Sequence, residues 1–222
     1  MLLCIPDILS PTEARQVCDR VQSLKFVDGS ATAGVFARTV KRNEQVENSP
    51  EAQKVQDFVM QALIRSVEFE RFARPRNMKP IMFSRYEPGM EYGTHVDNAV
   101  MSGRPPVRSD VSLTLFLSEP DSYDGGELTI RTLTGEEQIK LPAGSIVTYP
   151  SSSLHRVTPV TRGVRVAAVT WVQSMVRDPA CREILFDLET TRRSIFESQG
   201  KTREFDLISK SFANLMRMWA EV

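Results

Sequence analysis

The chain has 222 residues, and its 28 lysines and arginines balance its 28 aspartates and glutamates, so the formal net charge is zero. The length suits one sizeable domain with an appended segment, since domains typically span about 100–200 residues. Zero net charge argues against a protein built mainly to hold nucleic acid or anionic lipid. No apolar run approaches the roughly 20 residues that a membrane-spanning helix needs, so we expect no membrane partner.

The cysteines and the N-terminus predict a cytoplasmic protein. Cys4, Cys18 and Cys181 are far apart and form no Cys-x-x-Cys pair. This spacing argues against a disulfide scaffold or a four-cysteine zinc site, and it suits a reducing compartment. The first residues contain no basic stretch, and Pro6 and Asp7 interrupt their apolar run, so no secretory signal is expected.

The first third of the chain predicts a short strand over residues 2–5 and two helices. A capping box opens the first helix at Ser10, and a similar pairing of a cap with a proline opens the second at Ser49. The polar segment 25–48 between the helices is expected to contain short strands near 34–40. The spacing of apolar residues predicts a buried stripe on the second helix, made of Val55, Phe58, Val59, Ala62, Leu63 and Val67.

The character of the sequence changes after about residue 76. Short segments rich in β-branched and aromatic residues follow, and turns that contain glycine or proline separate them. Such segments predict a β-sandwich or barrel. The expected strands lie within 79–86, 111–118, 126–133, 137–141, 145–149 and 164–173.

A helical region follows from the cap Asp178, and Gly200 divides it into two amphipathic helices. We therefore divide the chain into an N-terminal helical and strand support region (1–76), a β core (77–176) and a C-terminal helical segment (177–222). The predicted fold class is α+β with a mainly β core. Helices that flank a sheet usually cover its outer face. The C-terminal helices are expected either to do this or to form the face of a homodimer.

The only two histidines, His95 and His155, are candidate metal ligands together with Asp97. Residues i and i+2 of a strand point to the same side, so His95 and Asp97 would converge. If a strand near His155 faces them, two imidazoles and one carboxylate meet. That set with open positions is the facial triad of non-haem Fe(II) oxygenases. The His-x-Asp motif alone is a weak signal, and a surface or hydrogen-bonded histidine is its common alternative.

Arg165 lies ten residues after His155, in a mostly apolar segment where it shares one strand face with Val169 and Trp171. If that face is interior, the guanidinium is buried, and a buried unpaired cation is very costly. Arginine binds carboxylates through a bidentate fork. A dicarboxylate held between iron and Arg165 would satisfy both groups, and an ion pair to a structural Asp or Glu is the alternative.

The combined spacing of the two histidines, Asp97 and Arg165 resembles that of the Fe(II)/2-oxoglutarate-dependent dioxygenases, in the prolyl 4-hydroxylase-like branch. The resemblance covers nearly the whole chain, because further stretches are similar to the PKHD-type hydroxylases in particular. These stretches are SRYEPGMEYGTHVDNA (84–99), YDGGEL (123–128), LPAG (141–144) and RDP (177–179) at the start of the helical tail.

The resemblance implies a double-stranded β-helix, or jelly-roll, with iron near one open end. His95, Asp97 and His155 would bind Fe(II). Arg165 would bind the distal carboxylate of 2-oxoglutarate, and Tyr86 would join that contact unless it is simply a core aromatic. The implied enzyme uses O2 and 2-oxoglutarate to hydroxylate a substrate and releases succinate and carbon dioxide, with L-ascorbate as a helper.

The sequence leaves the substrate open. The polar loop 98–110 follows the first two expected ligands, and its Arg104 and Arg108 are candidates to meet an anionic or carbonyl-rich substrate, or are ordinary surface arginines. The association of PKHD-type proteins with bacterial iron uptake suggests a role in iron homeostasis. A non-catalytic jelly-roll that senses iron and 2-oxoglutarate would use the same residues. Stoichiometric succinate production would separate an enzyme from such a sensor.

Overall fold

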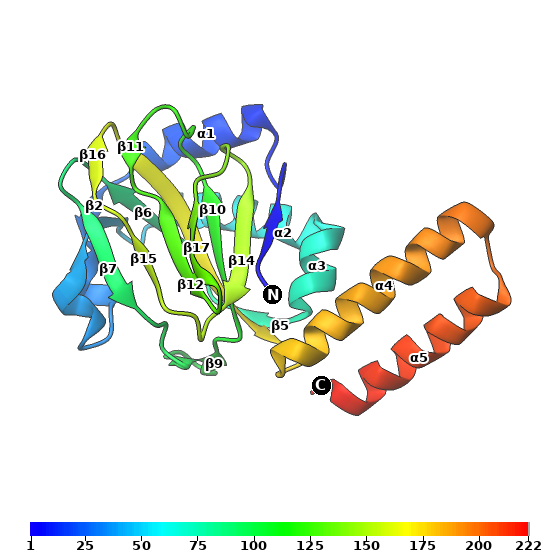
Figure 1. Ribbon diagram of the computed structural model, residues 1–222. Coiled ribbons are helices and arrows are strands. Elements are labelled where there is room, and N and C mark those ends of the chain that lie inside the picture. Colours follow the sequence, from blue (N-terminus) through cyan, green and yellow to red (C-terminus); the bar gives the residue numbers. More distant parts are fainter. Residues whose placement is uncertain (222) are drawn as a thin grey trace.

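A large antiparallel sheet forms the middle layer of the chain in the computed structural model, which describes residues 1–221 (Figure 1). Its two central strands are buried on both faces, because helices cover one side and a second sheet covers the other; for this reason they read as nearly continuous apolar runs. In spatial order the strands are β1 (Leu3–Ile5), β14 (Ile146–Pro150), β10 (Val111–Phe116), β17 (Arg165–Ser174), β6 (Met82–Tyr86), β4 (Glu44–Val46) and β2 (Phe26–Asp28), and β5 (Pro75–Met78) pairs with β17 beside this path.

A smaller antiparallel sheet faces the large one (Figure 1). Apolar side chains from both sheets, among them Phe116, Ile130 and Val147, pack in a cluster between them. Each of the six segments expected to be strands overlaps a strand of one of the two sheets. In spatial order the smaller sheet contains β13 (Gly135–Ile139), β12 (Leu128–Thr132), β15 (His155–Val157), β7 (Glu91–His95) and β3 (Lys41–Arg42), and the two-stranded ribbons are β8 (Val100–Met101) with β9 (Val107–Arg108) and β11 (Asp124–Gly125) with β16 (Val160–Arg162).

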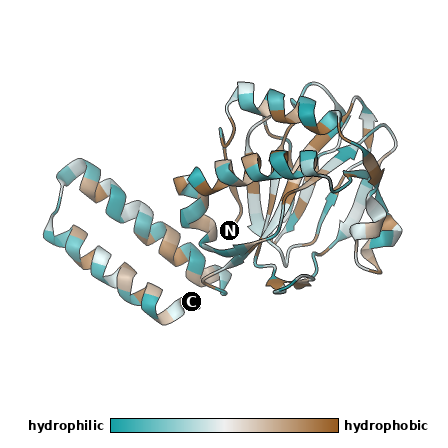
Figure 2. Ribbon diagram, turned by 180° about the vertical axis from the view of Figure 1, so that it is seen from behind, coloured by the Kyte–Doolittle hydropathy of each residue, from teal (hydrophilic) through white to brown (hydrophobic). Residues whose placement is uncertain are grey.

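Three helices, α1 (Pro11–Gln22), α2 (Pro50–Arg65) and α3 (Val67–Ala73), cover the outer face of the larger sheet (Figures 1 and 2). The capping box at Ser10 is present as predicted. The expected stripe of α2 is only partly buried, since Phe58 and Val67 are exposed. Val67 does not continue α2, because the Ser66 side chain caps α3 and the chain turns there.

The expected strands near residues 34–40 are wrong. This segment contains a short 3-10 helix, Ala37–Val40. The strand β2 precedes the segment, and β3 and β4 follow it. The Thr39 hydroxyl donates to the Phe36 carbonyl, and such local bonds compete with a strand ladder. Val35 and Phe36 are 79% and 89% exposed, so their apolar character does not reflect a place in a sheet.

The helices α4 (Pro179–Gln199) and α5 (Arg203–Trp219) form an antiparallel hairpin that projects from the sheets (Figure 1). Gly200 ends α4 with a φ of 73°, as its position in the sequence predicted. The hairpin does not cover a sheet face, because α5 packs on α4 rather than on the sheets. Within residues 1–221, no helix is long and apolar enough to cross a membrane.

A cluster of ion pairs fastens the hairpin to the helical layer. Glu189 of α4 accepts a hydrogen bond from Arg74 at 2.9 Å, and Arg71 and Arg192 approach it at 3.8 and 3.1 Å. Both Glu189 and Arg74 are buried. Burial raises the pKa of Glu189, but Arg74 and Arg192 outweigh that effect, so its pKa lies below the ordinary value.

Replacing Glu189 by glutamine is expected to destabilise the fold by about 3 kcal/mol, because it leaves the buried Arg74 without a counter-charge. Urea unfolding measures this loss. Since the folded pKa is lowered, the contribution of Glu189 is present above its unfolded pKa and disappears as the pH falls through the folded pKa. The difference between the two proteins should therefore shrink in acid, and a constant difference would contradict the assignment.

Candidate metal centre

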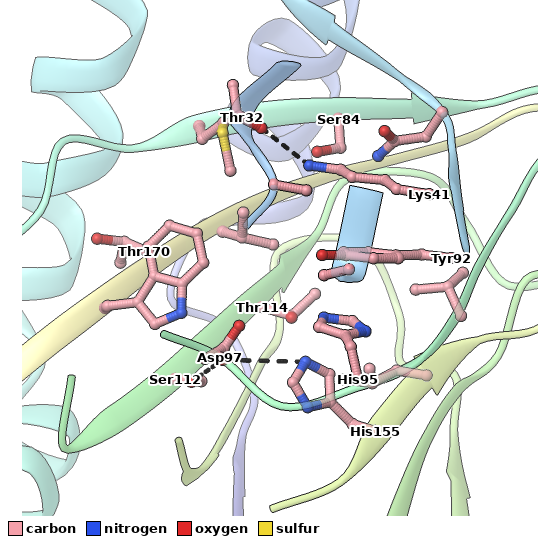
Figure 3. Close-up of a pocket in the computed structure, with 18 of the residues that line it drawn as sticks. Thr32, Lys41, Ser84, Tyr92, His95, Asp97, Ser112, Thr114, His155 and Thr170 are labelled. Carbon is pink, nitrogen blue, oxygen red and sulfur yellow. Dashed lines mark hydrogen bonds and ion pairs between the residues drawn. The ribbon is translucent and has the colours of Figure 1, made fainter. Parts of the chain in front are cut away.

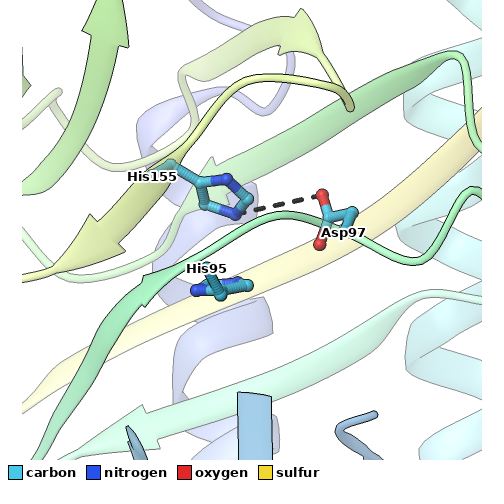
Figure 4. A group of neighbouring side chains, drawn as sticks. All are labelled: His95, Asp97 and His155. Atoms are coloured by element: carbon cyan, nitrogen blue, oxygen red, sulfur yellow. Dashed lines mark ion pairs between the residues drawn. The ribbon is translucent and has the colours of Figure 1, made fainter. Parts of the chain in front are cut away.

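Two neighbouring strands of the smaller sheet bring the histidines together. His155 of β15 pairs with His95 of β7 across the ladder, and their ring centroids lie 4.2 Å apart. Asp97 follows the end of β7 and points to the same place (Figure 4). One ligand atom from each of the three side chains lies within 4.8 Å of the others. The convergence expected from the His-x-Asp spacing is therefore present.

Backbone carbonyls orient both imidazoles. The Nδ1 atom of His95 lies 2.9 Å from the Gly93 carbonyl oxygen, and that of His155 lies 3.0 Å from the Ser153 carbonyl oxygen. In this arrangement each Nδ1–H donates to a carbonyl and leaves Nε2 with a free lone pair, as is usual for histidines that bind metals. The Nε2 atom of His155 lies 3.9 Å from an Asp97 oxygen.

The surroundings of the pair keep His95 neutral. Burial, followed by the neighbouring His155, lowers the pKa of His95 to about 4. The Tyr92 ring stacks on the His95 ring with a centroid distance of 3.6 Å. Neutral imidazoles are the form that binds metal ions, so His95 is ready to act as a ligand at neutral pH.

A second set of contacts holds the carboxylate. The Ser112 hydroxyl of β10 donates to Asp97 at 2.5 Å, and it lies 2.7 Å from the Ser151 hydroxyl. Asp97 comes from the smaller sheet's side and Ser112 from the larger sheet. The hydrogen bond therefore connects the candidate ligands to both sheets.

The three candidate ligands open into a cavity of about 100 Å³ between the sheets (Figure 3). Arg165, at the start of β17, lines the same cavity and is only 2% exposed. Its guanidinium lies 5.1 Å from the centre of the Tyr86 ring. The Nε atom has no hydrogen-bond partner within residues 1–221. The alternative of an ion pair to a structural Asp or Glu is not realised among these residues.

Two tyrosines surround Arg165. Burial raises the pKa of Tyr86, and the nearby Arg165 and Asn43 counteract this. Tyr123 is fully buried, and its hydroxyl lacks a hydrogen-bond partner within the described chain. A guanidinium with an unused donor that lines a cavity makes a site for a carboxylate.

The N-terminal strands β3 and β4 close one side of the cavity (Figure 3). They contribute Lys41 and Gln45, and Asn43 lies between them; all three side chains are buried. The Lys41 ammonium receives one hydrogen-bond acceptor, the Thr32 hydroxyl at 2.9 Å. Burial lowers the pKa of Lys41 to about 8, so it stays mostly protonated at neutral pH.

Comparison with known proteins places this site in a family. The family model of the 2OG-Fe(II) oxygenase superfamily matches residues 81–173, a range that contains the two histidines, Asp97 and Arg165. A PKHD-type hydroxylase of Synechococcus sp. (strain JA-2-3B'a(2-13)) is 53% identical over 224 residues, which cover 100% of both chains.

The chain belongs to the PKHD-type hydroxylases. It is therefore an enzyme of the 2OG-Fe(II) oxygenase superfamily, a conclusion that the resemblance in the sequence predicted.

Solved structures show that the PKHD-type hydroxylase shares its fold with prolyl hydroxylases. A prolyl hydroxylase of Trichoplax adhaerens superposes with a TM-score of 0.58 and 18% identity, covering 78% of this chain and 83% of that one. A prolyl-4-hydroxylase of Pseudomonas putida gives 0.54 and 20% identity, covering 78% and 92%. At this identity the likeness shows the fold alone, a mixture of helices and antiparallel sheets.

The structure brings five of the seven candidate residues of this hydroxylase into one cavity, and the two loop arginines are elsewhere. Arg104 is exposed on its loop. Arg108 donates to both oxygens of Asp110 at 2.7 and 3.0 Å and to Glu221 at 2.9 Å. Neither is among the residues that line the cavity. Asp110 and Glu221 already engage the Arg108 guanidinium. Substrate contacts from Arg104 and Arg108 stay predictions.

Sequence reasoning missed several residues of the cavity in the PKHD-type hydroxylase. Ser112 is an ordinary serine in an apolar strand, and only the pairing of β10 with its neighbours places it beside Asp97. Lys41 and Gln45 lie in the polar segment 25–48, just after the stretch 34–40 that was expected to contain strands. Their spacing in the sequence does not indicate a site, because Lys41 and Gln45 belong to strands of two different sheets that meet only in the folded protein.

Proposed function

We propose that this hydroxylase binds Fe(II) through His95, Asp97 and His155 and binds the distal carboxylate of 2-oxoglutarate through Arg165. It hydroxylates a substrate and releases succinate and carbon dioxide. The observation that supports the proposal most is the pairing, in one cavity, of the converging donor set with a buried arginine whose Nε has no partner among residues 1–221.

The donor set suits ferrous iron. Two imidazoles and one carboxylate on one side of a cavity are the ligands of non-haem Fe(II) oxygenases, and they leave positions open for further molecules. The Nδ1–H groups of both histidines donate to backbone carbonyls, so the orientation of the two Nε2 ligand atoms is fixed before metal binds. The Arg165 Nε, which has no partner among residues 1–221, suits a second anionic group in the cavity.

Bound iron and 2-oxoglutarate supply the oxygen-activating redox chemistry, and the protein supplies binding and orientation. His95, Asp97 and His155 hold one face of the metal. Arg165 fixes the far end of the cosubstrate, with Tyr86 and Tyr123 beside its guanidinium. Apolar side chains of both sheets, including Leu128, Val157 and Val169, line the cavity and limit the entry of water.

Other features of the proposal rest on the family resemblance. The two facing sheets would form a double-stranded β-helix, with 77–176 as the oxygenase core between a support region (1–76) and a helical segment (177–222). L-Ascorbate would sustain activity, and the enzyme would act in the cytoplasm on a substrate linked to bacterial iron uptake. The hairpin of α4 and α5 would provide the face of a homodimer.

Anaerobic titration tests the proposal directly. Fe(II) and then 2-oxoglutarate are added to the protein, and a visible metal-to-ligand charge-transfer band is expected to appear. Its absence would contradict the proposed site. Aerobic incubation with candidate substrates is then expected to give one succinate for each 2-oxoglutarate consumed. If the band forms but no succinate appears with any substrate tested, a sensor is favoured.

Replacing Ser112 by alanine is expected to weaken Fe(II) binding by about 10–100-fold without removing a ligand, because outer partners of metal ligands typically contribute that much. The Ser112 hydroxyl holds Asp97, and its loss frees the carboxylate to rotate. Competition with a colorimetric chelator measures the affinity. Ser153→Ala is a suitable control, since Ser153 holds His155 through its backbone carbonyl and not through its side chain. Equal affinities in the two variants would contradict this role for Ser112.

A further inference from the structure

Lys41 is a buried lysine that no acidic side chain neutralises. It is 6% exposed and forms no ion pair with the described aspartates and glutamates. The two carboxylates that act on Lys41 are otherwise engaged. Asp97 accepts a hydrogen bond from the Ser112 hydroxyl, and Asp28 accepts hydrogen bonds from the backbone N–H and the hydroxyl of Ser30, both at 2.8 Å. Taking an ammonium out of water without a counter-charge is costly. A buried ammonium of this kind is expected where an anionic ligand binds beside it and supplies the missing counter-charge.

The donors around Lys41 point to the same conclusion. An ammonium has three N–H groups, and the only acceptor of Lys41 within residues 1–221 is the Thr32 hydroxyl. That hydroxyl lies 2.7 Å from the Gln45 Oε1 atom, while the Gln45 Nε2 atom has no partner in the described chain. The amide of Asn43 is likewise without a partner there. The wall thus presents unused donors to the cavity.

Lys41 lies near the candidate metal position and on the opposite sheet from Arg165. Its Nζ atom is 5.1 Å from the centre of the Tyr92 ring, whose other face stacks on His95 (Figure 3). Lys41 belongs to the smaller sheet, where it pairs with Tyr92. Arg165 belongs to the larger sheet, where it pairs with Tyr86. The cavity therefore has two separate cationic groups.

When the formal charges in the filled cavity are summed, the charge of Lys41 has no counter-charge. Ferrous iron with the Asp97 carboxylate carries a single positive charge, and Arg165 adds another. The two carboxylates of 2-oxoglutarate cancel both. Lys41 then remains as an uncompensated buried cation beside a filled metal site, where a low dielectric makes the lack of a partner expensive.

We propose that Lys41, with the Gln45 amide beside it, binds a carboxylate group of the molecule that this enzyme hydroxylates. The substrate class is therefore an organic acid whose carboxylate lies on the β3 side of the cavity. The proposal rests on the proposed function, since it assumes that 2-oxoglutarate occupies Arg165. The alternative is that Lys41 binds a carboxylate of 2-oxoglutarate itself.

The experiment compares matched acids and amides. The anaerobic enzyme with Fe(II) and 2-oxoglutarate is titrated with N-acetylglycine, N-acetylalanine and their primary amides, and perturbation of the charge-transfer band reports binding. The acids are expected to perturb the band and the amides are not. In Lys41→Met the affinity for the acids should fall about tenfold or more, the loss expected for a charge-assisted hydrogen bond. Lys41→Arg should keep most of it.

Two further measurements separate the alternatives. The 2-oxoglutarate affinity, read from the same band, is expected to be unchanged in Lys41→Met; a tenfold loss would assign Lys41 to the cosubstrate and overturn the proposal. The melting temperature of the metal-free Lys41→Met protein is expected to stay equal or rise, because an uncompensated buried cation is removed. A clear fall would make Lys41 structural. The matched control is Lys25→Met, which replaces an exposed lysine.

The remaining outcomes are also decisive. Equal responses to acids and amides, or no response to any acid at millimolar concentration, would overturn the carboxylate site. If the wild-type protein gives no charge-transfer band at all, the proposed function fails instead. The failure of the Lys41 proposal is thus distinguishable from the failure of the iron site.

Discussion

His155→Ala is expected to abolish detectable hydroxylation and to weaken Fe(II) binding by more than about a hundredfold. The variant removes one of three converging ligands, whereas loss of an outer hydrogen-bond partner alone typically costs about 10–100-fold. No replacement imidazole exists, because the chain contains only His95 and His155. Equilibrium dialysis with Fe(II) measures binding, and succinate release measures turnover.

The neighbouring Arg156→Ala is the matched control for this variant. Arg156 follows His155 on β15 and points the other way, where it pairs with Glu136 at 2.6 Å on the surface. Exposed ion pairs contribute little to stability, so this variant should bind iron as the wild type does. Retention of iron by His155→Ala at wild-type affinity would mean that the metal binds elsewhere.

Arg165→Ala is expected to reduce the affinity for 2-oxoglutarate by at least about thirtyfold, while Fe(II) binding stays intact. Truncating one partner of a buried, hydrogen-bonded charge pair costs about 2–5 kcal/mol. The intensity of the charge-transfer band as a function of 2-oxoglutarate concentration gives the affinity. Arg165→Lys should retain only part of the affinity for 2-oxoglutarate, since a point charge does not reproduce the bidentate fork of arginine.

Arg162→Ala serves as the control, because Arg162 is an exposed arginine close in sequence that pairs with Asp124 on the other strand of its ribbon. A wild-type 2-oxoglutarate affinity in Arg165→Ala would leave the buried guanidinium without a function in the cavity. Equal losses in both variants would indicate a general effect of charge rather than a specific contact.

Local signals made much of the fold predictable. The caps at Ser10, Ser49 and Asp178 gave the starts of three helices, because capping depends on residues that are close in sequence. The i, i+2 rule gave the approach of Asp97 to His95. The apolar run after Val164 predicted a strand, and the burial of Arg165 followed on the condition that its face of that strand is interior, as it is.

Features that depend on tertiary packing were not predictable in the same way. The amphipathic pattern of α4 and α5 indicated buried stripes, but periodicity does not say what covers a helix. Here the two helices cover each other and extend away from the sheets. Residues 41–45, which contain β3 and the start of β4, are all polar and show no periodicity, so the positions of these strands, and of Lys41 between the sheets, required the structure.

The division of the cavity between two stretches of chain has a consequence for engineering. The candidate iron ligands and Arg165 all lie within residues 81–173. The side of the cavity that contains Lys41 and Gln45 comes from residues 26–46. Grafting that short N-terminal stretch from one relative onto another would exchange the proposed substrate-binding surface. The residues proposed to bind iron and 2-oxoglutarate would be unchanged. Hybrids of this kind offer a route to new hydroxylation products from a single catalytic scaffold.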